Sequence, residues 1–360
     1  MLFTPGSIGN LQLPNRLIRS ATAEKMADPT GVPRPQLLDL YGELARGGVG
    51  LIITGHLYIS SRGKCHPEMT GIHEDRLIPA LKALTGVVHR EGGRVVAQLN
   101  HGGGNCSPDS VDQPLAPSED PGELYKQSPR KITEEEIQDV ITDFQEAARR
   151  AQEAGFDGIQ IHAAHGYLIS QFTSPLSNRR DDRWGNRSSL LQEVCRGVRS
   201  VVGESYPVLI KFGMADGKPG GLSAADGAEI LAHFQEWGLD GVEISTGFSG
   251  EHIRSIQKGI RREEEEAYLL PLVKKARQAT QLPLIAVGGF RSRKVMEQVL
   301  LGGWANFISL SRPLIREPDL PQLLQEGEVS ASSCLSANNC WPENPGEGIA
   351  CKCPPLPEKA

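Results

Sequence analysis

The sequence has no apolar run that approaches the length of about 20 residues that a membrane-spanning helix needs. It also lacks a basic balance: 38 Lys and Arg stand against 44 Asp and Glu, for a net charge of −6. General nucleic-acid binders are usually basic, so nucleic acid is not an expected partner. The opening residues, MLFTPGSIGNLQLPNR, have neither the charged start nor the apolar core of a signal peptide. We therefore expect a cytoplasmic protein that does not contact a membrane.

Cysteine is scarce and odd in number, with seven in 360 residues. Cys65, Cys106 and Cys195 lie far apart along the chain, which favours free thiols in a reducing compartment over a disulfide framework. A chain of this length buries enough apolar surface to fold without disulfides. With 39% hydrophobic and 23% charged residues, the composition is that of a globular protein.

What the chain does contain is a repeated pattern of short β-branched runs. Eight of them occur, at 16–21, 49–54, 94–99, 157–162, 207–212, 240–245, 283–288 and 305–310. Segments of helical character separate most of them, which predicts parallel strands with right-handed crossovers. Eight such units indicate an α/β fold, a (β/α)8 TIM barrel over residues 1–328. An open doubly wound sheet is the alternative architecture.

Three segments stand out against this pattern. Residues 133–155 have an apolar stripe at helical spacing, with a capping-box pair, Thr133 and Glu136, at the start and Gly155 at the end. Residues 102–132 form a long Pro-, Gly- and Asp-rich loop, which is either a functional lid or a solvated insertion. Residues 329–360 form a Cys- and Pro-rich tail outside the predicted barrel.

The stretch DGIQIHAAHGY (157–167) ends a predicted strand with His162, His165 and Tyr167. Barrel active sites lie where strands run out at their C-terminal ends, so these three side chains are expected at the mouth. A zinc site would need a third protein ligand, which His56 or His101 could supply, although no zincin-type signature is present. Ordinary packing of buried histidines is the second interpretation. The third is a pair of imidazole donors for an oxyanion beside a phenol that donates a proton.

The seventh and eighth units have the features of a phosphate site. VGGFRS (287–292) places Gly288 and Gly289 before a helix start, and Arg312 follows the last strand. Backbone N–H groups at a helix N-terminus together with an arginine favour a phosphate. A simple turn with a surface arginine is the alternative interpretation of the same residues.

Several blocks resemble the Old Yellow Enzyme family of flavin oxidoreductases, nearest its 2,4-dienoyl-CoA reductase-like branch. The most specific block is HAAHGYLISQFTSPLSNRRDDRWG (162–185), and the resemblance covers residues 2 to about 325. The other blocks are LFTPGSIGNLQLPNRLIRSA (2–21), VAQLNHGG (96–103), VGGFRS (287–292) and SRPLIREPDL (311–320).

The resemblance implies a TIM barrel that holds FMN and reduces activated C=C bonds of α,β-unsaturated carbonyl compounds with NAD(P)H. His162 and His165 would bind the substrate carbonyl oxygen, and Tyr167 would protonate Cα as hydride passes from flavin N5 to Cβ. Its implied flavin contacts are Gln98 and Lys211 at the ring, Ala21, Thr22, Ala23 and Gly55 along it, and Gly288, Gly289, Ser311 and Arg312 at the phosphate. The chemistry leaves open an amine or dienoyl-CoA dehydrogenase of the same superfamily. A small-molecule substrate is expected, and a homo-oligomer is left open.

The tail departs most from the family pattern. Relatives of the dienoyl-CoA reductase type carry four cluster-binding cysteines here and a second domain beyond them. This chain has Cys334, Cys340, Cys351 and Cys353, with Ala337 at the expected second ligand. We therefore expect free thiols and no metal in the tail, with a rearranged cluster or a four-cysteine zinc site as the alternative interpretation of these cysteines. A partner-dependent electron-transfer subunit that docks through this tail is the alternative function.

Overall fold

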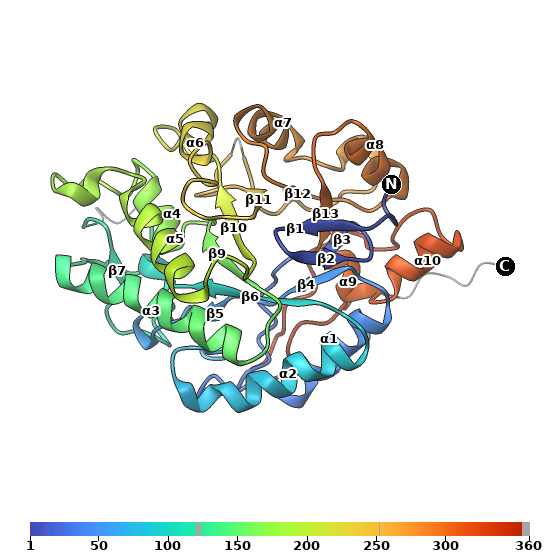
Figure 1. The fold of residues 1–360 in the computed structure, drawn as a ribbon, viewed down its shortest axis with the longest axis horizontal. Helices are drawn as coiled ribbons and strands as arrows, with labels where there is room; N and C mark the ends of the chain where they lie inside the picture. Colours follow the sequence, from blue (N-terminus) through green and yellow to red (C-terminus); the bar gives the residue numbers. More distant parts are fainter. Residues whose placement is uncertain (120–123, 252, 355–360) are drawn as a thin grey trace.

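Eight parallel strands form a closed barrel in the computed structural model, which describes residues 1–119, 124–251 and 253–354 (Figure 1). The strands are β3 (Leu17–Arg19), β4 (Leu51–Ile53), β6 (Val95–Asn100), β9 (Ile159–Ala163), β10 (Val208–Gly213), β11 (Gly241–Ser245), β12 (Leu284–Val287) and β13 (Phe307–Leu310). They pair in this order, and β13 pairs with β3 to close the ring. Each overlaps one of the eight predicted segments, and β6, β9 and β10 extend one residue beyond theirs. The (β/α)8 prediction is confirmed, and the open sheet is wrong.

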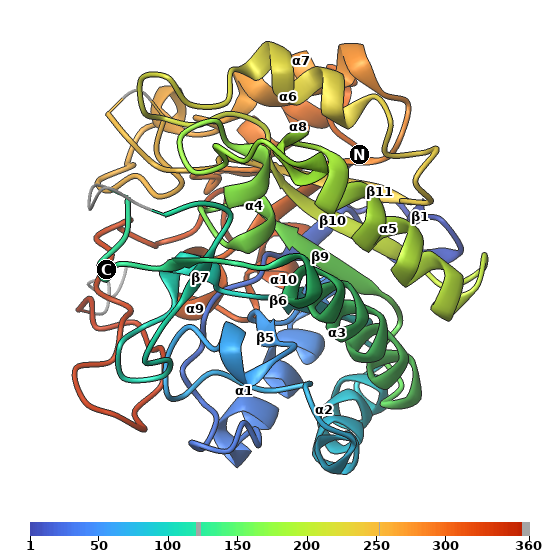
Figure 2. The ribbon, with the colours of Figure 1, turned by 90° about the vertical axis from the view of Figure 1, so that its left-hand side faces the viewer.

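Helices surround the barrel as the crossover rule for parallel strands requires (Figure 2). They are α1 (Pro35–Arg46), α2 (Ile78–Arg90), α3 (Glu134–Glu153), α4 (Leu168–Thr173), α5 (Ser189–Val202), α6 (Ala224–Leu231), α7 (Leu270–Ala279), α8 (Arg293–Leu301), α9 (Arg312–Arg316) and α10 (Leu320–Glu326). Short 3-10 turns are η1 (Ser61–Gly63), η2 (Asp75–Leu77), η3 (Gly103–Asn105), η4 (Arg183–Gly185) and η5 (Glu263–Glu265). Within the described ranges, no helix is both long and apolar enough to cross a bilayer.

Helix α3 follows its sequence signals closely. Its predicted stripe, Ile137, Val140, Ile141, Phe144, Ala147, Ala148 and Ala151, is buried. The capping box forms at the N-terminus: the Glu136 N–H donates to Thr133 Oγ1 at 3.2 Å, and the Thr133 N–H donates to Glu136 Oε2 at 3.1 Å. The chain leaves the helix through Gly155, whose φ of 81° favours glycine.

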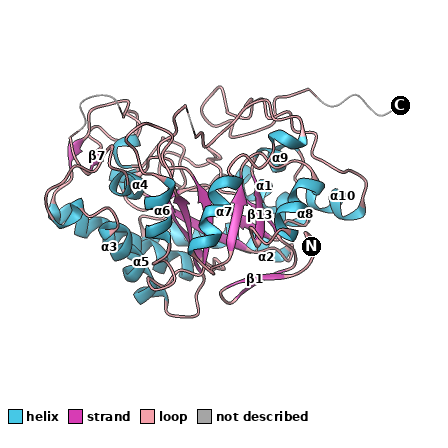
Figure 3. Cartoon of the chain, turned by 90° about the horizontal axis from the view of Figure 1, so that it is seen from above, coloured by secondary structure: helices cyan, strands magenta, loops and turns pink. Residues whose placement is uncertain are grey.

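A hairpin closes the end of the barrel where the strands begin. Its strands are β1 (Gly6–Ile8) and β2 (Leu11–Leu13), and Figure 3 shows it at the end opposite the long loops. Ile8, Leu11 and Leu13 pack with the apolar residues that fill the barrel interior. These are Ile18, Leu51, Ile53, Val96, Leu209, Ile285 and Phe307. A ligand can therefore reach the barrel from the C-terminal ends of the strands.

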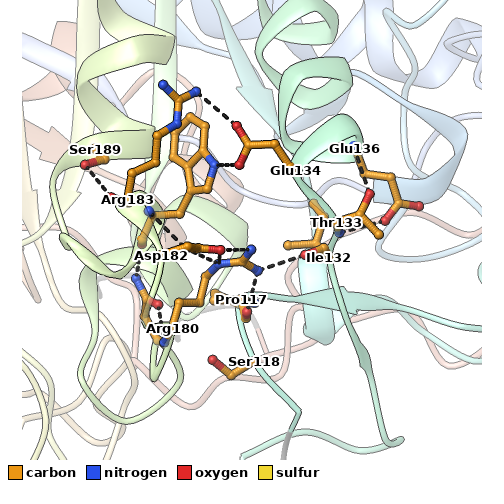
Figure 4. Close-up of polar contacts among 12 residues, drawn as sticks. Pro117, Ser118, Ile132, Thr133, Glu134, Glu136, Arg180, Asp182, Arg183 and Ser189 are labelled. Carbon is orange, nitrogen blue, oxygen red and sulfur yellow. Dashed lines mark hydrogen bonds and ion pairs between the residues drawn. The ribbon is translucent and has the colours of Figure 1, made fainter.

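The long loop after β6 is tied to the segment after α4. It carries the short strands β7 (Leu115–Ala116) and β8 (Arg130–Lys131), while β5 (Leu57–Tyr58) pairs with β6. Arg180 donates from Nη1 to the carbonyl oxygens of Pro117 and Ile132, at 3.0 and 2.8 Å, and pairs with Asp182 (Figure 4). The NRRDDRWG block therefore fastens this loop. Residues 120–123 of the long loop lie outside the described part of the chain.

The described part of the tail, residues 329–354, lies against the barrel. Ala331 forms an antiparallel bridge with Ser292, and the Ile349 N–H donates to the Glu24 carbonyl at 2.9 Å. The Gly259 N–H donates to the Ser336 carbonyl at 3.0 Å. All seven cysteines are free thiols. Residues 355–360 of the predicted tail lie outside the described residues.

Candidate active site

A cavity of about 350 Å³ opens at the C-terminal ends of the barrel strands. All predicted site residues except Gly55 line it, which gathers segments from across the chain at one mouth. They are Ala21, Thr22, Ala23, Gln98, His162, His165, Tyr167, Lys211, Gly288, Gly289, Ser311 and Arg312. The barrel geometry that the strand pattern predicts is what brings them together.

Gly55 does not line the cavity. Its N–H donates to Glu24 Oε1 at 3.0 Å and to the Tyr41 hydroxyl at 3.1 Å. A Cβ on Gly55 would lie 1.8 Å from Glu24 Oε2, so the Glu24 carboxylate closes that side. Glu24 in turn pairs with Arg19 at 2.8 Å, both of them buried. Gly55 therefore belongs to a buried polar cluster behind the wall.

The end of β9 places two imidazoles in the cavity wall. His162 is the last but one residue of the strand, and its Nδ1 accepts from the Ala164 N–H at 3.3 Å, which leaves Nε2 to carry the proton. His165 has a φ of 58°, and its Nε2 lies 2.8 Å from Ser245 Oγ. Burial lowers the pKa of His165 to about 3 and holds that of His162 well below its usual value. Both rings are therefore neutral near pH 7.

Tyr167 lies beside these rings. Its ring centroid is 4.9 Å from that of His162, and the side chain packs against Tyr58, Cys65 and Met69. Burial raises the pKa of Tyr167 well above 10, and the neighbouring Cys65 and Cys106 thiols raise it further. The hydroxyl therefore keeps its proton at physiological pH and can donate it.

His56 is a third imidazole in the cavity, and from the sequence it was considered only as a third zinc ligand. Its Nδ1 lies 2.9 Å from Asn100 Nδ2, and its ring centroid is 5.2 Å from that of Tyr167. Burial lowers the pKa of His56 to about 4. Among the described residues, no three His, Cys, Asp or Glu side chains are grouped as a metal site requires.

The floor of the cavity contains a buried ion pair. Lys211 Nζ donates to Glu243 Oε1 at 2.9 Å and to Ser20 Oγ at 2.8 Å. Burial alone would raise the pKa of Glu243, but the Lys211 charge and hydrogen bonds from Ser20, Lys211 and Ser309 outweigh it, and the pKa is lowered. Glu243 is thus ionised. Sequence reasoning missed it, although a charged residue inside the apolar strand DGVEIS was the available signal.

The predicted phosphate end lies between β12, α9 and the tail. Gly288 and Gly289 have φ values of 128° and 76°, and Ser311 Oγ lies 2.8 Å from Thr22 Oγ1. Arg312 Nη1 donates to the Gln257 carbonyl at 2.8 Å, to Asn338 Oδ1 at 3.0 Å and to the Ser336 carbonyl at 3.3 Å. Five tail residues that sequence reasoning did not assign also line the cavity: Ser336, Asn338, Cys340, Trp341 and Ile349.

The donor set fits FMN. At one end Gln98 and Lys211 offer an amide and an ammonium, which suit the polar edge of a heteroaromatic ring. At the other end the guanidinium of Arg312 lies beside Gly288 and Gly289, which both have positive φ. A guanidinium and backbone N–H groups in such a turn suit an anion. A Cβ on Gly289 would lie 2.4 Å from Ile260 Cδ1, so only glycine lets the backbone line the cavity there.

Comparison with known proteins agrees with this geometry. The family model described as NADH:flavin oxidoreductase / NADH oxidase matches residues 1–330. A metal reductase of Desulforamulus reducens is 35% identical over 344 residues, which are 94% of this chain and 51% of that protein. The chain thus spans about half the length of that relative. An NADPH dehydrogenase of Geobacillus thermodenitrificans is 34% identical, and the match covers 89% of this chain and 92% of that protein.

Solved structures show the same likeness. The old yellow enzyme homologue of Zymomonas mobilis superposes with a TM-score of 0.79 at 26% identity, over 92% of this chain and 94% of that one. A 2-naphthoyl-CoA reductase complexed with 2-naphthoyl-CoA gives a TM-score of 0.86 at 25% identity, over 92% of this chain and 54% of that one.

Proposed function

Because the chain belongs to the NADH:flavin oxidoreductase / NADH oxidase family, we propose that it is an ene-reductase of that family. The family assignment confirms the resemblance found in the sequence and, with it, FMN as cofactor and NAD(P)H as reductant. The proposal concerns the oxidising substrate. We propose that this substrate is an α,β-unsaturated carbonyl compound, whose activated C=C bond accepts a hydride and a proton.

The observation that carries the proposal is the neutral His162 next to a protonated Tyr167 in one cavity. Hydride arrival at Cβ drives negative charge onto the carbonyl oxygen. An N–H donor there stabilises the transition state more than the ground state. A donor of this kind contributes about 3 to 4 kcal/mol in oxyanion holes.

Each of the groups in the cavity has a separate role in the proposed reaction. FMN, when bound, supplies the hydride. The Nε2–H of His162 binds the carbonyl oxygen, and His165 lies beside it, oriented by Ser245. Tyr167 gives its proton to Cα and regains one from solvent in the next turnover. The neutral imidazoles leave the Tyr167 proton in place, because their lowered pKa values make them too weakly basic to remove it.

The lining residues argue against an amine substrate. One relative is an N,N-dimethylglycine/sarcosine dehydrogenase of Chromohalobacter salexigens, 31% identical over 94% of this chain and 50% of that protein. An ammonium group is bound most strongly by a carboxylate, through charge-assisted hydrogen bonds. None of the described residues that line the cavity is Asp or Glu, and Lys211 adds a like charge. A carbonyl oxygen suits this donor-rich wall better.

The test is an anaerobic titration of the purified protein. We expect yellow FMN protein that NADH or NADPH bleaches and that cyclohex-2-enone then reoxidises. An amine such as sarcosine, added without nicotinamide, should leave the flavin oxidised. Bleaching by the amine together with no reoxidation by the enone would contradict the proposal and indicate a dehydrogenase. A protein that takes up no FMN would contradict it as well.

A further inference from the structure

Glu243 is a fully buried carboxylate beneath the cavity. It lies on β11, is 0% exposed and is not one of the residues that line the cavity. A buried ion survives only where charge and hydrogen bonds replace the lost water. The reaction proposed above does not use this carboxylate directly, so its presence calls for a role.

Four donors from four parts of the barrel hold this carboxylate. Oε1 accepts from Ser20 Oγ at 2.6 Å, from Ser309 Oγ at 2.7 Å and from Lys211 Nζ at 2.9 Å. Oε2 accepts from Gln160 Nε2 at 3.0 Å. The donors follow or belong to β3, β13, β10 and β9, so the carboxylate cannot turn without breaking bonds to several strands.

The carboxylate also determines how Gln98 is oriented. A carboxylate only accepts, so Gln160 must present its NH₂ group to Glu243 and its Oε1 to the other side. Gln160 Oε1 accepts from Gln98 Nε2 at 2.6 Å. The amide of Gln98 is thereby fixed, with its Oε1 and one N–H left for the cavity. Gln160, like Glu243, is buried and does not line the cavity.

We propose that Glu243 is the positioning residue for both polar contacts of the flavin ring, Gln98 and Lys211, and that its charge offsets that of Lys211. The inference rests on the proposed FMN site. Reduction adds negative charge to the flavin, which the Lys211 ammonium favours and the Glu243 carboxylate opposes. The carboxylate therefore lowers the reduction potential of the bound FMN and favours onward transfer of hydride to a weak acceptor.

Among the described residues that line the cavity, the imidazoles beside this ion pair are uncharged. His162 lies opposite Lys211 in the strand register, and His165 and His56 are the other titratable groups that face it. Burial lowers the pKa of His56 to about 4 and that of His165 to about 3, and it lowers that of His162 well below 6.5. All three rings are therefore neutral near pH 7, so a change in the flavin potential caused by a substitution at Glu243 is not mixed with their titration.

The experiment compares the FMN midpoint potential of the wild-type holoenzyme with that of Glu243→Gln. The potential is measured anaerobically against a reference dye at about pH 7.5. We expect a positive shift of at least 30 mV, which corresponds to a tenfold change in the relative affinity for reduced over oxidised FMN. A shift no larger than that of the control would overturn the proposal.

Asp240→Asn is the matched control. Asp240 immediately precedes the same strand but lies at its other end, where Oδ2 accepts from Arg199 Nη2 at 2.7 Å and from the Val208 N–H at 2.8 Å. The Asp240→Asn substitution removes a carboxylate from an ion pair without changing a residue of the cavity. Its FMN potential should stay at the wild-type value, even if the protein is less stable.

Gln160→Leu serves as a second variant if Glu243→Gln does not fold. It breaks the link from Glu243 to Gln98 and leaves the Lys211–Glu243 pair in place. We expect the dissociation constant of FMN, measured by flavin fluorescence, to rise roughly fivefold or more, as for one lost hydrogen bond. An unchanged FMN affinity would contradict the positioning role. If the wild-type protein itself binds no FMN, the proposed function fails before either variant is compared.

Discussion

The rings of His162 and Tyr167 meet edge to face, with centroids 4.9 Å apart and planes at 88°. The four residues between them include two left-handed positions, His165 at φ 58° and Gly166 at φ 70°. This turn folds the end of β9 back, so that an imidazole and a phenol from one short stretch enter the same cavity. A Cβ on Gly166 would lie 2.9 Å from the Phe248 ring, which adds crowding to the backbone requirement for glycine.

Tyr167→Phe should separate the two half-reactions. The variant keeps the ring that packs against Cys65 and Met69 but has no proton to give to Cα. We expect enone-driven reoxidation of the flavin to slow by roughly 10²-fold or more, the range of general acid catalysis, while NAD(P)H reduction changes by less than about threefold. Stopped-flow absorbance of the flavin measures both rates. Equal slowing of both half-reactions would show that Tyr167 shapes the cavity and does not donate the proton.

Enone reduction should show little pH dependence between about pH 5.5 and 8.5. An exposed histidine, with a pKa near 6.5, would gain charge in this range as the pH falls. Burial lowers the pKa of His165 to about 3, so its neutral form is lost only as the pH falls through that value. Tyr167 has its pKa raised above 10, so its proton is lost only above the range. Single-turnover rates measured across this range test the prediction. A pH–rate profile that titrates near pH 6.5 in the wild type, and no longer does so in His162→Asn, would contradict it.

The sequence predicted the barrel because each parallel strand is buried on both faces and reads as a short apolar run. The same regularity predicted that His162, His165 and Tyr167 would lie at the barrel mouth. Their roles came from family resemblance, since spacing alone left zinc binding and plain packing open.

Three features could not be predicted in this way. The position of Glu243 depends on donors from four strands, which no local pattern contains. The tail residue Asn338 reaches the cavity through tertiary packing that has no periodicity. Gly55 follows β4, but the strand-end rule does not say which side chain will close the wall beside it, and here Glu24 does.

Arg312→Ala should weaken binding of FMN but not of riboflavin. The guanidinium is held by Gln257 and the tail through Nη1, and its other nitrogens remain for an anion. Loss of a charge-assisted hydrogen bond of about 1.5 to 3 kcal/mol predicts a rise of roughly 10-fold to 150-fold in the FMN dissociation constant. Flavin fluorescence quenching measures both ligands.

The control for Arg312 is Asn338→Ala, which removes one contact with the tail and keeps the guanidinium. We expect less than about a threefold loss of FMN affinity. If both variants weakened FMN and riboflavin to the same degree, Arg312 would act by anchoring the tail, and its assignment to the phosphate would be wrong.

Arg180→Ala should destabilise the protein far more than Arg183→Ala, although the two arginines lie three residues apart. The Arg180 side chain is 3% exposed and donates hydrogen bonds to the Pro117 and Ile132 carbonyl oxygens. Without Arg180 both carbonyl oxygens lose this donor. We expect the free energy of unfolding to fall by about 2 to 4 kcal/mol. Arg183 is 60% exposed and pairs with a half-exposed Glu134, so its removal should cost under about 1 kcal/mol. Urea unfolding at one fixed FMN concentration, with unchanged m-values, provides the comparison. Equal losses would show that the NRRDDRWG block does not fasten the long loop through Arg180.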